Sequence, residues 1–72
     1  MAFRYESPSN DPAVAAQEAL HMAGYRGEEV TLVFSGTFEW DDSPVTVEVE
    51  VAPGDTAKQV VQAMKDAAAA KR

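Results

Sequence analysis

The first residues whose types could support acid–base chemistry lie in a helical stretch near the N-terminus. His21 is the only histidine, and it follows Gln17 by four residues and Glu18 by three, a spacing that places all three on one helix face. Acid–base catalysis also needs a second positioned group and a pocket. A histidine near a helix C-terminus is stabilised as a cation by the helix dipole. We therefore expect His21 to influence pH-dependent stability, and catalysis only if it shares a pocket with a carboxylate or subunits build a shared site.

A second group of candidates is acidic. Glu39, Asp41 and Asp42 are close in sequence and carry the oxygen ligands that Ca²⁺ or Mg²⁺ prefers. The spacing does not match an EF-hand loop, because the string of oxygen donors and the glycine at the sixth position are missing. The motifs GxxxxGK[ST], GxGxxG, HExxH and GxSxG are also absent. We therefore predict a solvated acidic turn, no metal, no cofactor and no enzyme activity.

An aromatic row, Phe34, Phe38 and Trp40, would suggest base stacking on a basic surface. In an acidic segment it predicts core packing instead, because nucleic-acid bases arrive with phosphates that the carboxylates repel. Trp40 differs from the other two, since it stands at a predicted strand end beside the acidic turn. A large amphipathic ring in that position can anchor a protein partner.

Composition limits the class of protein. The chain has 72 residues, no cysteine and a formal net charge of −6. This length predicts one domain, and because much of its 46% hydrophobic content is alanine, we expect a thin core. The negative charge makes direct binding to nucleic acid or to an anionic membrane unfavourable. We expect no signal peptide, no membrane span, and a place in the cytoplasm, or in a virion if the chain is encoded by a phage.

Periodicity predicts two helices. Asp11 and Pro12 have the form of a helix start, and the apolar spacing continues to about Ala23, with Gly24 as a stop. A capping box formed by Thr56 with a glutamine three residues later opens a second, amphipathic helix that extends into the alanine-rich tail.

Period-two alternation between the helices predicts two strands, over residues 29–40 and 45–51, joined by a turn at residues 41–44. Gly36 interrupts the first strand, which suggests a bulge, a bend or the close approach of a helix backbone. Because an isolated hairpin is marginal in water, the two helices must cover its apolar face. We predict an α+β fold, a two-layer α-β-β-α arrangement in which an antiparallel β-hairpin packs against two helices.

The N-terminal residues stand apart from this domain. A proline-bearing stretch at residues 7–12 separates an N-terminal arm, residues 1–10, from a single α+β domain, residues 11–72. The alternation in residues 2–5 allows a short extra strand along the hairpin edge. It equally allows the arm to pair with a neighbouring molecule.

Residues 45–61, with their valine-rich strand, Pro-Gly turn and threonine-capped helix, resemble the second strand and helix entry of ubiquitin-like β-grasp domains. The resemblance covers under a quarter of the chain. Residues 62–72 contain neither the diglycine of the modifiers nor a pattern that predicts a later strand. The resemblance therefore implies a shared local arrangement and no function.

The distribution of charge suggests two functions. Residues 28–55 carry eight carboxylates and no Lys or Arg. The first hypothesis is a non-catalytic protein–protein interaction or assembly module, with self-association or incorporation into a larger, phage-like particle as options. The alternative is a phage-type inhibitor whose carboxylates occupy a basic, nucleic-acid-binding groove of a target protein. The predicted partner-binding residues are Phe3, Tyr5, Glu39, Trp40, Asp41, Asp42, Glu48 and Glu50.

Overall fold

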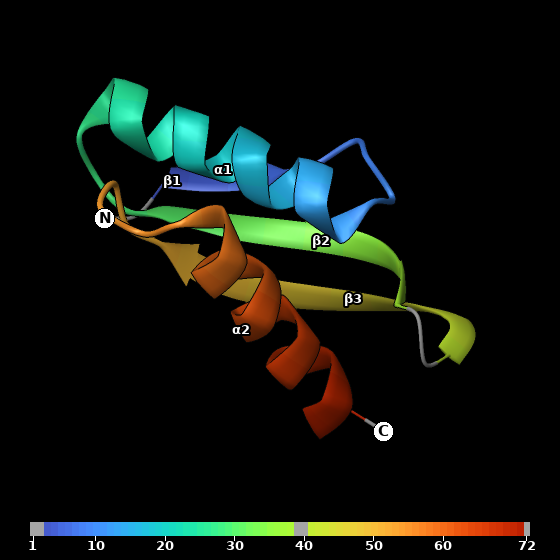
Figure 1. The fold of residues 1–72 in the computed structure, drawn as a ribbon. Coiled ribbons are helices and arrows are strands. Elements are labelled where there is room, and N and C mark those ends of the chain that lie inside the picture. Colours follow the sequence, from blue (N-terminus) through green and yellow to red (C-terminus); the bar gives the residue numbers. More distant parts are fainter. Residues whose placement is uncertain (1–2, 39–40, 72) are drawn as a thin grey trace.

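A computed structural model of the chain describes residues 3–38 and 41–71, and it contains a mixed three-stranded sheet and two helices (Figure 1). In chain order the elements are β1 (Phe3–Glu6), α1 (Pro12–Arg26), β2 (Val30–Phe38), β3 (Asp41–Val51) and α2 (Ala57–Ala70). The predicted α+β class and the hairpin packed against two helices are confirmed. Neither helix of the described residues has the length and apolar character needed to cross a membrane.

The sheet has the strand order β1-β2-β3. β2 and β3 form the predicted antiparallel pair, in which Val30 lies opposite Val51. β1 pairs parallel with β2, and Phe3 lies opposite Val30. The direction is parallel because the chain returns to the sheet through α1, as in a β-α-β unit. The alternation near the N-terminus therefore forms a third strand within the same chain.

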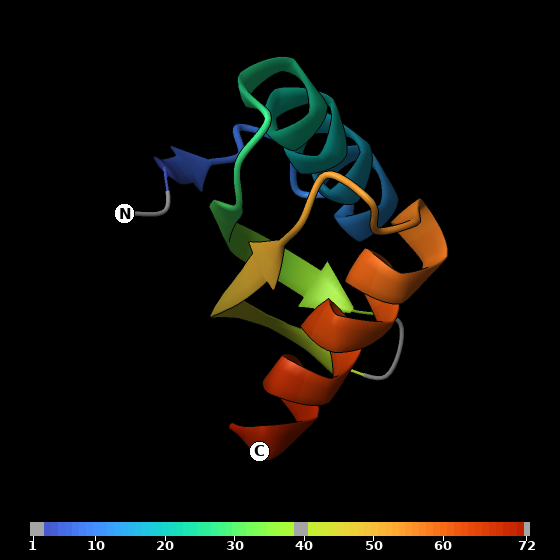
Figure 2. The same cartoon turned by 90° about the vertical axis from the view of Figure 1, so that its left-hand side faces the viewer.

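Both helices cover one face of the sheet, and the other face carries no helix (Figure 2). α1 packs on β2, α2 packs on β3, and the helices also contact each other. The apolar side chains of the strands point towards the helices, as period-two alternation requires. The buried core comprises Ala15, Ala16, Ala19, Ala23, Val30, Leu32, Phe34, Phe38, Val47, Val49, Val51, Val60, Met64 and Ala68.

The helix starts were predicted correctly, because side-chain caps are local signals. The Asp11 carboxylate accepts a hydrogen bond from the Ala13 amide at 2.9 Å. Thr56 Oγ1 accepts from the Gln59 amide at 3.2 Å, and Gln59 Oε1 accepts from the Thr56 amide at 2.9 Å. These bonds satisfy backbone donors that have no partner within the helix.

Gly36 marks a close approach between two backbones. A Cβ at this position would lie 2.9 Å from the Asn10 carbonyl oxygen and 2.7 Å from Cζ of Phe34. The approaching backbone is the segment before α1 and not a helix. Glycine at this position therefore allows the start of α1 to sit directly against β2.

The predicted connection at residues 41–44 is wrong. β3 begins at Asp41, and Phe38 pairs with Asp41. The register shifts between the pairs made by Gly36 and Phe38, which leaves three residues of β3 opposite one residue of β2. Pro44 lies in this irregular stretch, where a strand tolerates a residue that has no N–H to donate.

The predicted end of the first helix is also wrong. α1 continues through Gly24 to Arg26, and Gly27 is the C-terminal cap, with φ 66° and its amide bonded to the Ala23 carbonyl at 2.8 Å. Either glycine could end the helix on local grounds. The longer helix places Arg26 over the Phe3 ring of β1, which is a contact between distant parts of the chain.

Alanine substitutions at these two glycines should have opposite effects. Gly24 is inside α1 and a Cβ there meets no atom within 4 Å, so Gly24→Ala should stabilise the fold by up to about 1 kcal/mol. Gly27→Ala should destabilise it by about 1–2 kcal/mol, because alanine is strained at positive φ. Urea denaturation followed by circular dichroism measures both. Equal effects would contradict the assignment of the helix end.

Candidate functional site

The face of the sheet that carries no helix presents mostly polar side chains, and we refer to it as the open face. Its residues are Arg4, Glu6, Thr31, Val33, Ser35, Thr46, Glu48 and Glu50. Alternation places them opposite the core residues of the same strands. The hydroxyls of Ser35 and Thr46 are hydrogen-bonded across β2 and β3 at 2.8 Å.

An ion pair crosses the open face. The two terminal nitrogens of Arg4 each donate to one carboxylate oxygen of Glu48, both at 3.2 Å. Arg4 is on β1 and Glu48 is on β3, so the guanidinium must extend across the central strand β2. Val33 on β2 is only 8% exposed although no helix covers this face. The side chains remain 56% and 53% exposed, so the pair contributes only about 0–1 kcal/mol to stability.

The net charge of the open face is negative. It has three carboxylates, on Glu6, Glu48 and Glu50, and one guanidinium, on Arg4. A second cation from outside the acidic segment, Arg26, donates to Glu28 at 3.1 Å. Two of the eight carboxylates predicted to form a cation-free surface are thus paired with arginines from other parts of the chain, while Glu50 has no ion-pair partner among the described residues.

Two of the three aromatic residues predicted to contact a partner, Phe3 and Tyr5, lie on the other side of β1. Phe3 and Tyr5 are half-buried, pack against the core, and therefore do not share a surface with Glu48. The Arg26 guanidinium lies 4.2 Å from the centroid of the Phe3 ring. Burial raises the pKa of the Tyr5 hydroxyl, and the charge of Glu18 and a hydrogen bond with it raise this pKa further. Both rings therefore hold β1 against α1.

The remaining predicted contact residues divide into three groups. Glu39 and Trp40 lie outside the described residues. Asp41 and Asp42 lie at the start of β3, and their side chains are likewise outside the description. Glu48 and Glu50 are exposed on the open face.

The prediction missed Arg4 and Glu6 as part of the same surface. Alternation in residues 3–6 could have placed these two side chains together on one face of a strand. The pairing that sets Glu6 and Glu48 on either side of Val33 is a property of the assembled sheet, which the alternation of a single strand does not reveal.

The acid–base candidates are not brought together. His21 and Gln17 are exposed on α1, whereas Glu18 accepts a hydrogen bond from the Ser7 hydroxyl at 2.6 Å. Across the described ranges, no group of three or more His, Cys, Asp or Glu side chains could hold a metal ion.

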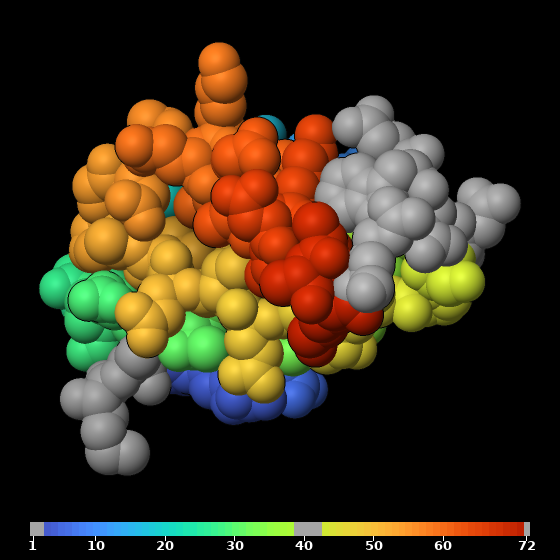
Figure 3. Space-filling view, turned by 90° about the horizontal axis from the view of Figure 1, so that it is seen from below, coloured from blue at the N-terminus to red at the C-terminus, as the bar shows by residue number. Residues whose placement is uncertain are grey.

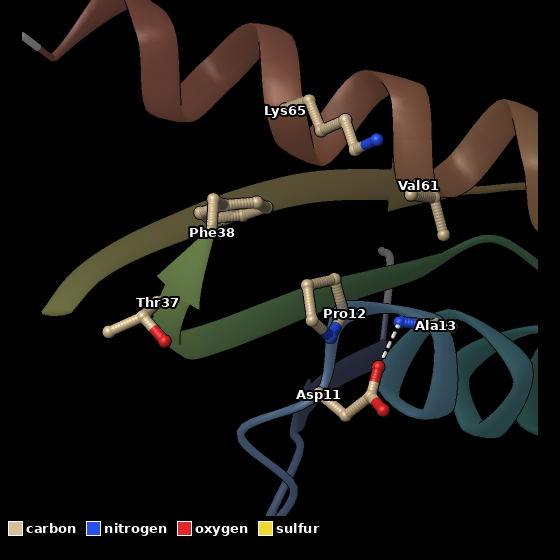
Figure 4. Close-up of a pocket in the computed structure, with 7 residues that line it drawn as sticks. All are labelled: Asp11, Pro12, Ala13, Thr37, Phe38, Val61 and Lys65. Atoms are coloured by element: carbon tan, nitrogen blue, oxygen red, sulfur yellow. Dashed lines mark hydrogen bonds between the residues drawn. The ribbon is translucent and has the colours of Figure 1, made fainter. Parts of the chain in front are cut away.

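A hollow of about 230 Å³ lies between the start of α1, the end of β2 and the middle of α2 (Figure 4). Its lining residues are Asp11, Pro12, Ala13, Thr37, Phe38, Val61 and Lys65. Oδ1 of the Asp11 carboxylate accepts a hydrogen bond from the Ala13 amide and so caps the helix. His21 is not among the lining residues, and this hollow therefore assembles no acid–base pair with it.

Comparisons with protein families, with curated proteins and with solved structures found no match to this chain. The surfaces and contacts described above are therefore the features that can indicate its function.

Proposed function

We propose that this chain is a small non-catalytic protein-binding module that presents its acidic open face to a basic surface of another protein. The observation that carries the proposal is the one-sided sheet: both helices cover one face, and the other face holds three carboxylates and one guanidinium. Complementary charge on a partner would accelerate association and select against acidic competitors.

The placement of the acid–base candidates supports a binding role over catalysis. General acid–base chemistry needs a donor or acceptor held beside a second group in a pocket. His21 is instead exposed on α1, and Glu18 is occupied by Ser7 at 2.6 Å. Nucleic acid is a poor direct ligand, because the formal net charge of the chain is −6.

A narrower version of the proposal is an inhibitor that fills the nucleic-acid-binding groove of its target. The exposed side chains of Glu48 and Glu50 project from the same face of β3, two residues apart, and could replace backbone phosphates in such a groove. This version predicts that duplex DNA or RNA competes with the chain for the captured protein. A component of a larger particle would bind its partner without such competition.

The test compares the immobilised chain with two charge-reversed variants in an extract of the source cells. Glu50→Lys changes the open face, whereas Asp66→Lys makes the same change of net charge on an exposed position of α2. We expect a protein to be retained at about 0.05 M salt and released at about 0.5 M. Glu50→Lys should weaken its binding about tenfold, or about 1.4 kcal/mol, and Asp66→Lys less than about twofold.

Two results would contradict the proposal. One is that no protein is retained in a salt-dependent way. The other is that Glu50→Lys and Asp66→Lys weaken retention equally, because the net charge and not the open face would then determine binding.

A further inference from the structure

The outer edge of β3 can be assigned from the hydrogen bonds on the other side of the sheet. The Phe3 amide donates to the Glu29 carbonyl at 3.3 Å, and the Ser7 amide donates to the Val33 carbonyl at 3.0 Å. The backbone groups of Glu29, just before β2, and of β2 residues 31 and 33 therefore point towards β1. Since these groups alternate in direction along a strand, those of residues 30, 32 and 34 point towards β3.

The partners of these three β2 residues are Val51, Val49 and Val47. The intervening β3 residues are Thr46, Glu48 and Glu50. Their amides and carbonyls must therefore point away from β2, towards the outer edge of the sheet. A second observation supports this direction for Thr46: the Lys71 ammonium, at the end of α2, donates to the Thr46 carbonyl. No described residue bonds to the outward backbone groups of Glu48 or Glu50.

The same residues carry the negative charge. The Glu48 and Glu50 side chains lie on the open face, and those of Val47 and Val49 are buried beneath the helices. Figure 3 shows the molecule from below relative to Figure 1: part of β3 is uncovered next to α2, and the C-terminal end of α2 reaches over the strand. A row of unpaired backbone groups is a template for adding another strand.

Charge selects the strand that can be added. A second copy of β3 would bring its own Glu48 and Glu50 to the same face, and like charges in adjacent strands destabilise the pairing. A strand with Lys or Arg at alternate positions would instead place its cations beside these carboxylates. The residues between the cations would point to the helix side of the sheet.

We infer that the β3 edge binds an extended segment of a basic partner protein by strand addition, with Lys or Arg at every second position facing Glu48 and Glu50. This inference rests on the proposed function and specifies the partner's conformation and charge pattern. Lys71 blocks one position of this edge, because its bond to the Thr46 carbonyl must be released before an added strand can donate a hydrogen bond to that carbonyl.

The first experiment uses two peptides of the same composition with the intact chain. One alternates, Thr-Lys-Val-Lys-Val-Lys-Thr, and the other groups its residues, Val-Val-Thr-Thr-Lys-Lys-Lys. We expect the alternating peptide to bind about tenfold more tightly by calorimetry. Amide hydrogen exchange followed by NMR should slow at Glu48 and Glu50 in that complex, because their outward amides become hydrogen-bonded.

A pair of variants at one position separates backbone pairing from charge. Glu50→Gln and Glu50→Pro both remove the carboxylate, but only proline also removes the outward amide. Because this amide does not bond to β2, proline should leave the β2–β3 pairing intact. We expect Glu50→Gln to weaken binding of the alternating peptide about two- to fivefold. Glu50→Pro should weaken this binding about tenfold more than Glu50→Gln does.

A second pair remains informative if Glu50→Pro does not fold by circular dichroism. Lys71→Ala and Lys58→Ala change the net charge equally, and both positions are exposed on or next to α2. Lys71→Ala should bind the alternating peptide about threefold more tightly than Lys58→Ala does, because only the former uncovers the Thr46 carbonyl.

The outcomes separate this inference from the proposed function. Equal binding of the two peptides without slowed exchange at Glu48 and Glu50 would overturn strand addition. Failure of both peptides to bind would overturn it as well. In either case, salt-dependent capture of a protein, weakened by Glu50→Lys, would still support the proposed function. If no such capture were seen, the proposed function and this inference would both be overturned.

Discussion

Replacing Phe34 with alanine should lower the free energy of unfolding by roughly 3–5 kcal/mol, the usual cost of truncating a buried phenylalanine. Phe34 has no exposed surface and is among the largest fully buried side chains. Its ring packs edge-on against Phe38, with 5.6 Å between the ring centroids and 69° between the planes. Truncation would remove this contact and leave a cavity between the sheet and the helices, in a core whose fully buried α1 residues are all alanines.

The expected loss is large relative to the total stability. A domain of 72 residues at roughly 0.05–0.15 kcal/mol per residue has about 4–11 kcal/mol. We therefore expect Phe34→Ala to be largely unfolded, or to unfold at much lower urea concentration when followed by circular dichroism. Tyr25→Ala is the matched aromatic control, because Tyr25 is 85% exposed and its loss should change stability by less than about 0.5 kcal/mol. Similar losses for both variants would contradict the assigned core.

Replacing Gly36 with alanine should also destabilise the fold, by about 1–3 kcal/mol, through overpacking. The new methyl group would lie 2.7 Å from Cζ of Phe34 and 2.9 and 3.2 Å from the carbonyl oxygen and Cα of Asn10. Relief would require the buried ring to move, or the segment before α1 to move off the sheet. Both changes disturb the contact between α1 and β2.

Gly24→Ala provides the control for this substitution, since it adds the same methyl group where no atom lies within 4 Å. Thermal or urea unfolding should show opposite signs for the two variants. If Gly36→Ala were as stable as the parent chain, the close approach between Asn10 and β2 would not hold in solution.

Part of the open face could be predicted, and part could not. The alternation of valine and glutamate in residues 45–51 predicts that Glu48 and Glu50 face solvent, and both are exposed. Arg4 contributes to the same face through its bond to Glu48 at 3.2 Å. These two residues are 44 positions apart, so no local pattern predicts that they meet.

The sequence by itself determined the elements whose signals are local. A side-chain cap needs only its neighbours, which is why Asp11 and Thr56 mark the starts of the helices. Period-two alternation needs only the covalent geometry of an extended chain, which is why the apolar face of the hairpin was predicted. These interactions act within a few residues and are the same in any fold.

Tertiary structure decided what depends on competition between distant contacts. Two glycines could end α1, and the longer helix brings Arg26 over Phe3. The N-terminal strand could pair within the chain or with a neighbour, and it pairs parallel with β2. Pairing order sets which backbone groups face outward, so the outer edge of β3 and the acidic face beside it exist only in the assembled sheet. The physical reason is that strand pairing and helix packing gain their energy from residues far apart in sequence, which local propensity does not encode.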